Sequence, residues 1–236
     1  MRSAKGDFKD EIEAFCELLR KRTTVGDFLK GFDCIIARVQ DAGLVGQYRF
    51  GRKGNGIDLK KLRDEVSPVA RFVGKYARPD DVISFRLDDR FPDCTLRHHD
   101  GLKRDIEVTL ARGKARFHEM TELNERGETR GFLDLQDDAS NADVAAAKGQ
   151  EPKMYSTDEA ITNIVRAVEI SAEGKRRHKG HTLLIEVVPD MYWLPNDRWL
   201  CLPGRFADNP AIRALCFSEV YVTSKSDEAD LVLRIK

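Results

Sequence analysis

The sequence lacks three features that would assign a function class at once: an excess of one charge, a long apolar run and a patterned set of cysteines. Its 40 basic and 40 acidic side chains balance, so net charge predicts neither a nucleic-acid nor a membrane partner. No stretch approaches the ~20 apolar residues that span a membrane, and the opening MRSAKGDFKDEIEAF has no apolar signal core. We therefore expect a cytoplasmic protein with no membrane partner.

The five cysteines show no metal-binding spacing. No two of them form a CxxC pattern, and most lie within apolar segments, where a free thiol behaves as a small hydrophobic side chain. These features argue against a disulfide framework and against a zinc site, and they favour a reducing compartment. The five are Cys16, Cys34, Cys94, Cys201 and Cys216.

Apolar residues at helical spacing dominate the first part of the chain. They predict amphipathic helices at residues 8–22 and 25–39 and a shorter helix at residues 59–66. Ser67 followed by Pro68 has the form of an N-cap and a first-turn proline, so a separate helix is expected to begin there. The first 66 residues are thus predicted to form an N-terminal helical region, either a lobe or a layer packed on the core.

The pattern then changes to strands that alternate with helices. Ser156 and Glu159 form a capping box that opens one helix, and TLLIEVV at residues 182–188 is apolar enough for a strand covered on both faces. This order predicts an α/β fold, a mixed sheet flanked by helices, with residues 67–236 as its core. The other predicted elements are strands at 82–87, on both sides of 99–101, at 131–136, 219–223 and 230–235, a helix at 112–124 and a loop at 137–153.

The segment FPDCTLRHHDGLKRDIEVTL, residues 91–110, reads as a hairpin whose register can be argued. A two-residue Asp-Gly turn would mix polar and apolar side chains on each face. A three-residue turn, residues 99–101, pairs Asp93 with Glu107 instead and gathers the apolar side chains on one face. We therefore predict the second register. Its polar face carries Asp93, Thr95, Asp105, Glu107 and Thr109.

This register brings two carboxylates, Asp93 and Glu107, to within about 5 Å of each other at their Cβ atoms. Like charges that close share a proton, attract a cationic side chain or bind a metal ion. Oxygen ligands of this kind suit Mg²⁺, which commonly uses one or two carboxylates together with water and phosphate oxygens. The following helix would add the basic side chains Arg112, Lys114 and Arg116, and so complete a site for metal-assisted phosphodiester hydrolysis.

Pro92-Asp93 on one strand and Glu107-Val108-Thr109 on the next resemble the motif of the PD-(D/E)XK nuclease superfamily. The resemblance implies a restriction-endonuclease-like core made of a helix, a strand hairpin, a crossover helix and a further strand. It also implies a Mg²⁺ or Mn²⁺ site formed by Asp93, Glu107 and the main-chain carbonyl of Val108.

Two further positions follow from the same resemblance. Thr109 stands where the superfamily has a lysine, which normally helps to orient or activate the attacking water. Lys114, on the predicted helix that follows, is our candidate for that catalytic role. Glu65 is the candidate for the acid of the first helix, which would join the metal ligands.

These features predict a metal-dependent nuclease that hydrolyses phosphodiester bonds in DNA, with RNA as the second option, in genome defence or in a mobile element. A homodimer is compatible with the sequence. Threonine at position 109 favours an alternative, a catalytically inactive nuclease-like fold that binds nucleic acid or protein. A third interpretation is a polar surface hairpin on an unrelated α/β enzyme, with Asp93 and Glu107 far apart or facing solvent.

Three other segments have simpler interpretations. His98 and His99 flank the predicted turn, and adjacent strand residues point to opposite faces, so a shared metal ion is not expected. RRHKGH, residues 176–181, ends a helix, where positive charge complements the helix dipole. FGRKGNG, residues 50–56, is either a nucleic-acid contact or only a flexible basic turn.

Overall fold

A computed structural model describes most of the elements predicted from the sequence. The described residues are 4–43, 59–88, 90–111, 140, 142–143, 146, 156–175, 180–187, 196–225 and 230–236. Lys114 with its predicted helix, the predicted strand at 131–136 and the loop at 50–56 lie outside the described residues, as does most of the predicted loop at 137–153. Those predictions are therefore untested.

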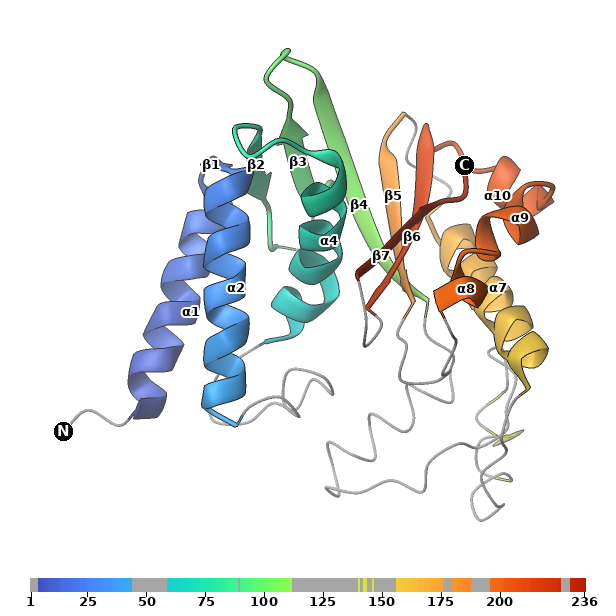
Figure 1. Cartoon of the computed structure of the whole chain (residues 1–236), viewed down its shortest axis with the longest axis horizontal. Coiled ribbons are helices and arrows are strands. Elements are labelled where there is room, and N and C mark those ends of the chain that lie inside the picture. Colours follow the sequence, from blue (N-terminus) through green and yellow to red (C-terminus); the bar gives the residue numbers. More distant parts are fainter. Residues whose placement is uncertain are drawn as a thin grey trace. The chain divides into compact units, whose positions relative to one another are not determined.

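The chain has an α/β fold with a seven-stranded mixed sheet, as the alternation of patterns predicts (Figure 1). Its internal contacts define two compact units. Unit 1 comprises Met1–Val108 and His181–Leu184, and unit 2 comprises Thr109–Gly180 and Ile185–Lys236. The N-terminal region predicted at residues 1–66 falls within unit 1, together with the helix and strands that follow it.

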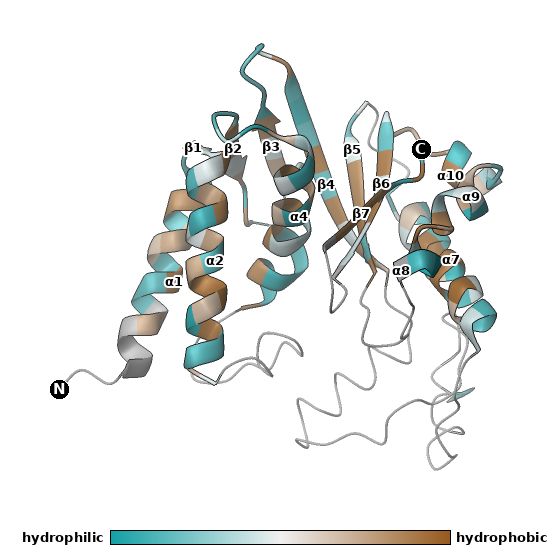
Figure 2. Cartoon of the chain, viewed as in Figure 1, coloured by the Kyte–Doolittle hydropathy of each residue, from teal (hydrophilic) through white to brown (hydrophobic). Residues whose placement is uncertain are grey.

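Unit 1 begins with two amphipathic helices, α1 (Ala4–Arg20) and α2 (Val25–Asp41), where the apolar spacing predicts them. Thr24 caps α2, because its hydroxyl oxygen accepts a hydrogen bond from the N–H of Asp27 at 3.1 Å. The two helices lie side by side (Figure 1), and apolar and polar residues alternate along α2 (Figure 2). Each helix therefore buries one stripe and exposes the other.

A π-helical turn, η1 (Leu62–Val66), leads directly into α4 (Ser67–Tyr76). The prediction that Ser67 caps a separate helix is wrong, because Val66 and Ser67 both have helical backbone angles. The Ser67 hydroxyl instead accepts a hydrogen bond from Nη1 of Arg71 at 2.8 Å. Isolated π-helical turns are rare and are frequent at functional sites. The polar residues of this one are Arg63, Asp64 and Glu65.

The first strands form an antiparallel series, in which each strand pairs with the next. They are β1 (Thr23–Thr24), β2 (Val82–Phe85), β3 (Cys94–Arg97) and β4 (Lys103–Ala111). The predicted three-residue turn is confirmed: Cys94 pairs with Ile106, and the His98 N–H donates to the Leu102 carbonyl at 2.9 Å. Gly101 has a φ of 85°, which glycine adopts without steric cost.

The apolar face of the β3–β4 hairpin is buried as predicted. Cys94, Leu96 and Ile106 are 0% exposed, and Val108 is 6% exposed. Burial raises the pKa of the Cys94 thiol well above its ordinary value, so this side chain stays protonated and packs as a small hydrophobic group. The register is specified by this face, because a slip of one residue would expose all four side chains.

The main helix of unit 2 is α7 (Thr157–Glu173), and it begins at the predicted capping box. The Ser156 hydroxyl accepts from the Glu159 N–H at 3.3 Å, and the Ser156 N–H donates to the Glu159 carboxylate at 2.9 Å. Short helices follow: α8 (Asn196–Trp199), α9 (Leu202–Phe206) and α10 (Pro210–Arg213). In the described part of the chain, no helix is both long and apolar enough to cross a bilayer.

The late strands also occur where the sequence predicts them. β5 (Thr182–Val187) runs through parts of both units, and all of its residues are buried. β6 (Glu219–Lys225) and β7 (Asp230–Arg234) pair antiparallel in unit 2. A strand buried on both faces needs an almost wholly apolar composition, which is why β5 is recognisable without alternation.

One polar contact in unit 2 allows a direct test of buried hydrogen bonding. Thr223 is 0% exposed and donates its hydroxyl to Oε2 of Glu186, which is 8% exposed, at 2.6 Å. Thr223→Val keeps the shape and removes the donor, so we expect it to lower the free energy of unfolding by about 1.5–3 kcal/mol. Denaturant unfolding would measure the loss. Thr162→Val, on the exposed face of α7, is the control, and an equal loss in both variants would contradict the prediction.

Candidate active site

Asp93 and Glu107 lie at one end of the polar face of the hairpin. Continuing the observed β3–β4 register by one residue places Asp93 opposite Glu107. The next pair on the same face is in contact, since the Thr95 hydroxyl donates to Oδ1 of Asp105 at 2.7 Å. The two acids that the sequence singles out therefore share one face of adjacent chain segments.

The regular hydrogen-bond ladder between β3 and β4 ends at Pro92. The last hydrogen bond at this end is made by the side chain of Asp93. Every second pair in an antiparallel ladder is hydrogen-bonded, so the bond between His98 and Leu102 puts Val108 in a bonded position opposite Pro92. Pro92 has no N–H to donate. The Val108 N–H donates to Oδ2 of Asp93 at 2.7 Å. This bond fixes the orientation of the Asp93 carboxylate.

Glu107 is buried although it lies on the polar face of the hairpin. Its side chain is 4% exposed, and Asp93 is half-buried. An ionised carboxylate loses several kcal/mol of hydration on burial unless a cation or hydrogen bonds compensate for the loss. Glu107 therefore has the environment of a paired or metal-binding carboxylate and not that of a solvated surface residue.

The oxygen atoms at this end of the hairpin fit a hard divalent cation. The N–H and C=O of one strand residue point to the same side, so the Val108 carbonyl is directed toward Pro92, as its N–H is. Two carboxylates and a carbonyl are the oxygen donors that Mg²⁺ prefers, and water or phosphate oxygens complete its shell. Within the described ranges, no three His, Cys, Asp or Glu side chains gather into a metal-binding group.

The remaining predicted site residues are less closely defined by the structure. Thr109 follows Val108 on β4 and is half-buried, while Lys114 lies outside the described residues. Glu65 lies in η1, where its carboxylate accepts from Nζ of Lys61 at 2.7 Å. Its charge is already balanced by that lysine, so a role for Glu65 as a metal ligand stays a prediction.

Sequence reasoning missed a second polar cluster on the same face. Nζ of Lys103 donates to Oδ2 of Asp105 at 2.7 Å, and Nδ1 of His181 lies 3.8 Å from the same oxygen. The His181 ring packs edge-on against Phe91, with 4.7 Å between ring centroids. Burial tends to raise the pKa of Asp105, but the hydrogen bonds from Lys103 and Thr95 outweigh it and lower the pKa below its ordinary value. No local pattern indicates these contacts, because His181 is far from the hairpin along the chain.

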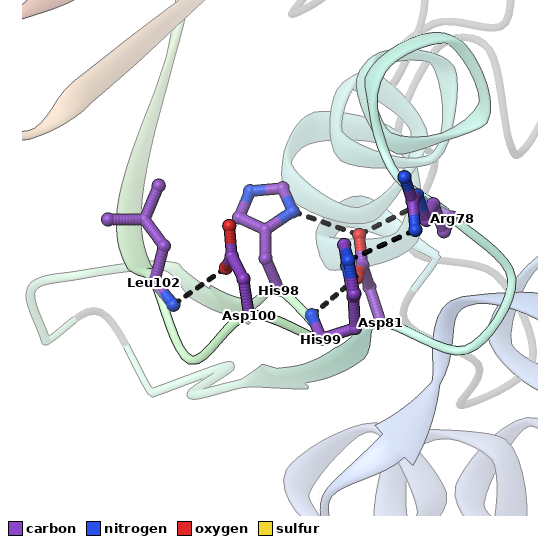
Figure 3. A network of polar contacts seen from close by, with 6 residues as sticks. All are labelled: Arg78, Asp81, His98, His99, Asp100 and Leu102. Atoms are coloured by element: carbon purple, nitrogen blue, oxygen red, sulfur yellow. Dashed lines mark hydrogen bonds and ion pairs between the residues drawn. The ribbon is translucent and has the colours of Figure 1, made fainter.

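The tip of the hairpin is tied to the connection between α4 and β2 by Asp81, which is 1% exposed (Figure 3). Oδ2 of Asp81 accepts from the Arg78 N–H and contacts Nδ1 of His98, both at 2.9 Å, and Oδ1 accepts from the His99 N–H at 2.9 Å. Nδ1 of His99 lies 3.6 Å from Oδ1. The expectation that the two histidines point apart is wrong, because His99 belongs to the turn and both rings approach one carboxylate.

Comparisons with models of protein families, with curated proteins and with solved structures gave no match for this chain. The resemblance carried by Pro92-Asp93 and Glu107-Val108-Thr109 is therefore neither supported nor contradicted by a relative. The function has to be argued from the geometry of the described residues.

Proposed function

We propose that this chain is a metal-dependent nuclease whose active site lies at the Asp93–Glu107 end of the β3–β4 hairpin. One observation carries the proposal: Glu107 is 4% exposed on the face where the register aligns it with Asp93, and the Val108 N–H holds the Asp93 carboxylate. Converging acids favour a bound cation, and a phosphodiester supplies the anionic oxygens that complete its coordination. The substrate is accordingly nucleic acid, DNA in the first place and RNA as the second option.

The order of the elements supports a PD-(D/E)XK-like core. Helix α4 is followed by strands β2, β3 and β4, then by helix α7 and by β5, which is the neighbour of β4 in the sheet. This order is compatible with the helix, hairpin, crossover helix and further strand that the motif resemblance implies. The crossover helix predicted at 112–124 and the strand predicted at 131–136 lie outside the described residues.

In the proposed mechanism the chain positions the ion and the scissile phosphate. Asp93 and Glu107 would hold Mg²⁺ through carboxylate oxygens and Val108 through its carbonyl, while the Val108 N–H keeps Asp93 oriented. When bound, the ion supplies Lewis-acid stabilisation of the charge that develops on the phosphate. Thr109 has no amine, so another group has to accept the proton of the attacking water.

The alternative is a nuclease-like protein that binds nucleic acid or protein and does not cleave. The half-buried Thr109 favours it, because a hydroxyl cannot supply the charge or the basicity of the motif lysine. Metal binding by Asp93 and Glu107 would be dispensable in such a protein. The two functions therefore differ in their response to divalent ions.

The test uses the full chain with single- and double-stranded DNA and RNA, in the presence of Mg²⁺, Mn²⁺ or a chelator. We expect cleavage with either ion and none with the chelator, because two carboxylates without a cation cannot stabilise phosphate charge. Gel assays would follow cleavage, and calorimetric titration with Mn²⁺ would follow ion binding. Nucleic-acid binding without cleavage in any condition would support the alternative, and the absence of both cleavage and Mn²⁺ binding would contradict the proposal.

A further inference from the structure

We propose that His181 is the general base of this site and does the work that the superfamily assigns to its motif lysine. The inference rests on the proposed nuclease function and adds a catalytic residue to it, with Asp105 as its positioning residue. It starts from the contacts of His181 in unit 1 and not from any sequence motif.

The His181 ring is held from two directions. Oδ2 of Asp105 lies 3.8 Å from its Nδ1, and Phe91 packs against it edge-on with 4.7 Å between centroids. Asp105 is itself fixed, because Oδ1 accepts from the Thr95 hydroxyl and Oδ2 from Nζ of Lys103, each at 2.7 Å. A carboxylate that is restrained on both oxygens can orient an imidazole reproducibly.

These contacts place the imidazole on the face of β4 that carries Glu107. Asp105 precedes Glu107 by two residues on β4, so both side chains are on one face of the strand. His181 directly precedes β5, the neighbour of β4 in the sheet. His181 is also accessible, with 26% of its side chain exposed. It therefore lies on the acid-bearing face and remains open to water.

The Asp105 carboxylate next to the ring determines which ring nitrogen of His181 carries the proton. A carboxylate facing Nδ1 favours the Nδ1–H form, which leaves the lone pair on Nε2. The separation of 3.8 Å is longer than a hydrogen bond, and catalytic contacts of this kind commonly shorten when substrate binds. Among the described residues, Asp105 lies beside the ring and Lys103 contacts Asp105, while Asp93 and Glu107 lie farther along the hairpin.

The proposed step transfers one proton from the attacking water to His181. Nε2 of neutral His181 takes one proton from water while the water oxygen forms a bond to phosphorus, and the bond from phosphorus to the leaving oxygen breaks. The leaving oxygen takes a proton from a solvent water, and the imidazolium later returns its proton to solvent. One water is consumed, and the products are a phosphate monoester and a hydroxyl.

The decisive variant is His181→Gln, compared with His99→Gln as a histidine control on the hairpin tip. We expect the rate of Mg²⁺-dependent cleavage to fall about 10²-fold or more in His181→Gln. The pH–rate profile of this variant should lack the limb that depends on a neutral imidazole. Added imidazole should restore part of the rate to His181→Ala. The His99→Gln protein should keep the wild-type profile. Cleavage by His181→Gln with an unchanged rate and pH profile would overturn the inference and leave the nuclease function standing.

Ion binding separates failure of the inference from failure of the proposed function. Mn²⁺ should bind wild type and His181→Gln with the same affinity, and in the wild type it should broaden the NMR signals of the His181 ring more than those of His99. Equal broadening would overturn the placement of His181 whatever the activity. If His181→Gln does not fold, Asp105→Asn is the second variant, and an unchanged His181 tautomer and pH profile there would overturn the positioning role. A wild-type protein without cleavage would remove both proposals.

Discussion

Replacing Asp81 with alanine is expected to lower the free energy of unfolding by about 3–5 kcal/mol, because it breaks a buried polar network. The Asp81 carboxylate is 1% exposed and serves the N–H groups of Arg78 and His99 together with the ring of His98. Without it, these three groups lose their shared acceptor (Figure 3). The hairpin tip would then lose its attachment to the connection between α4 and β2.

The contribution of Asp81 depends on pH in a defined direction. Burial favours the neutral acid, yet the hydrogen bonds from Arg78, His99 and His98 together lower the pKa of Asp81 below its ordinary value of 3.8. A carboxylate with a lower pKa in the folded state stabilises the fold above its unfolded pKa, and this contribution is lost as the pH falls through the folded pKa. The difference in unfolding free energy between wild type and Asp81→Ala should therefore shrink below pH 3.8.

Thermal and denaturant unfolding of Asp81→Ala and Asp80→Ala would test this prediction. Asp80 is the adjacent carboxylate and is exposed, so its removal should change stability by no more than about 0.5 kcal/mol. A drop in Tm of roughly 10 °C is expected for Asp81→Ala in a chain of this length. Equal stability of the two variants would show that the buried network contributes nothing.

The parts of the fold that the sequence predicts correctly are those with a local physical signal. The β3–β4 register follows from side-chain alternation, because the other register would expose Cys94 and Ile106. The start of α7 follows from the capping box, and β5 follows from its apolar composition. In each case one short segment determines its own structure, so no knowledge of distant contacts is required.

The errors arise where the surrounding structure overrides the preference of a single position. Ser67 has the pattern of an N-cap, but the helical turn before it continues and its hydroxyl accepts from Arg71 instead. His99 leaves the strand geometry at the turn and approaches Asp81 together with His98. The first error comes from continuation of the preceding helical turn, and the second comes from a contact between the hairpin tip and the connection before β2. The linear pattern contains neither.

The same distinction between local signals and distant contacts applies to the candidate site. Asp93 and Glu107 could be paired from the sequence because both lie on the hairpin, where the register relates them directly. The burial of Glu107 could not be predicted, since alternation assigns it to the polar face. His181 could not be placed either, because its contact with Asp105 depends on β5 lying next to β4. Sequence reasoning thus paired Asp93 with Glu107 but could not place His181.

Glu107→Gln and Asp93→Asn are each expected to reduce cleavage by about 10³-fold or more. Lewis-acid stabilisation of the transition state is worth several kcal/mol, and about 4 kcal/mol corresponds to a factor of about 10³ in rate. Both substitutions keep the shape of the side chain. In Asp93→Asn the side-chain carbonyl can still accept from the Val108 N–H, so the strand end should persist while the charge is lost.

The response of stability to Mg²⁺ should distinguish these variants from the wild type. Each variant removes one of the two charges that would hold the ion, so its stability should respond less to Mg²⁺ than that of the wild type. With Mg²⁺ at 100 times its Kd, the wild type should gain about 2.7 kcal/mol, and the variants should gain little. The Mg²⁺-dependent increase in Tm is therefore a readout of the site that requires no substrate.

Asp88→Asn is the matched control, since Asp88 is an exposed acid in the connection that leads to Asp93 and pairs only at the surface with Arg90. It should retain both the cleavage rate and the Mg²⁺-dependent stabilisation, because a surface pair contributes little. Cleavage within about threefold of wild type in both Glu107→Gln and Asp93→Asn would exclude the two acids from catalysis, since loss of an ion ligand cannot leave the barrier unchanged. Loss of cleavage with full retention of the Mg²⁺ shift would instead assign them to substrate positioning. Only the joint loss of rate and ion-dependent stability identifies Asp93 and Glu107 as the residues that hold the ion.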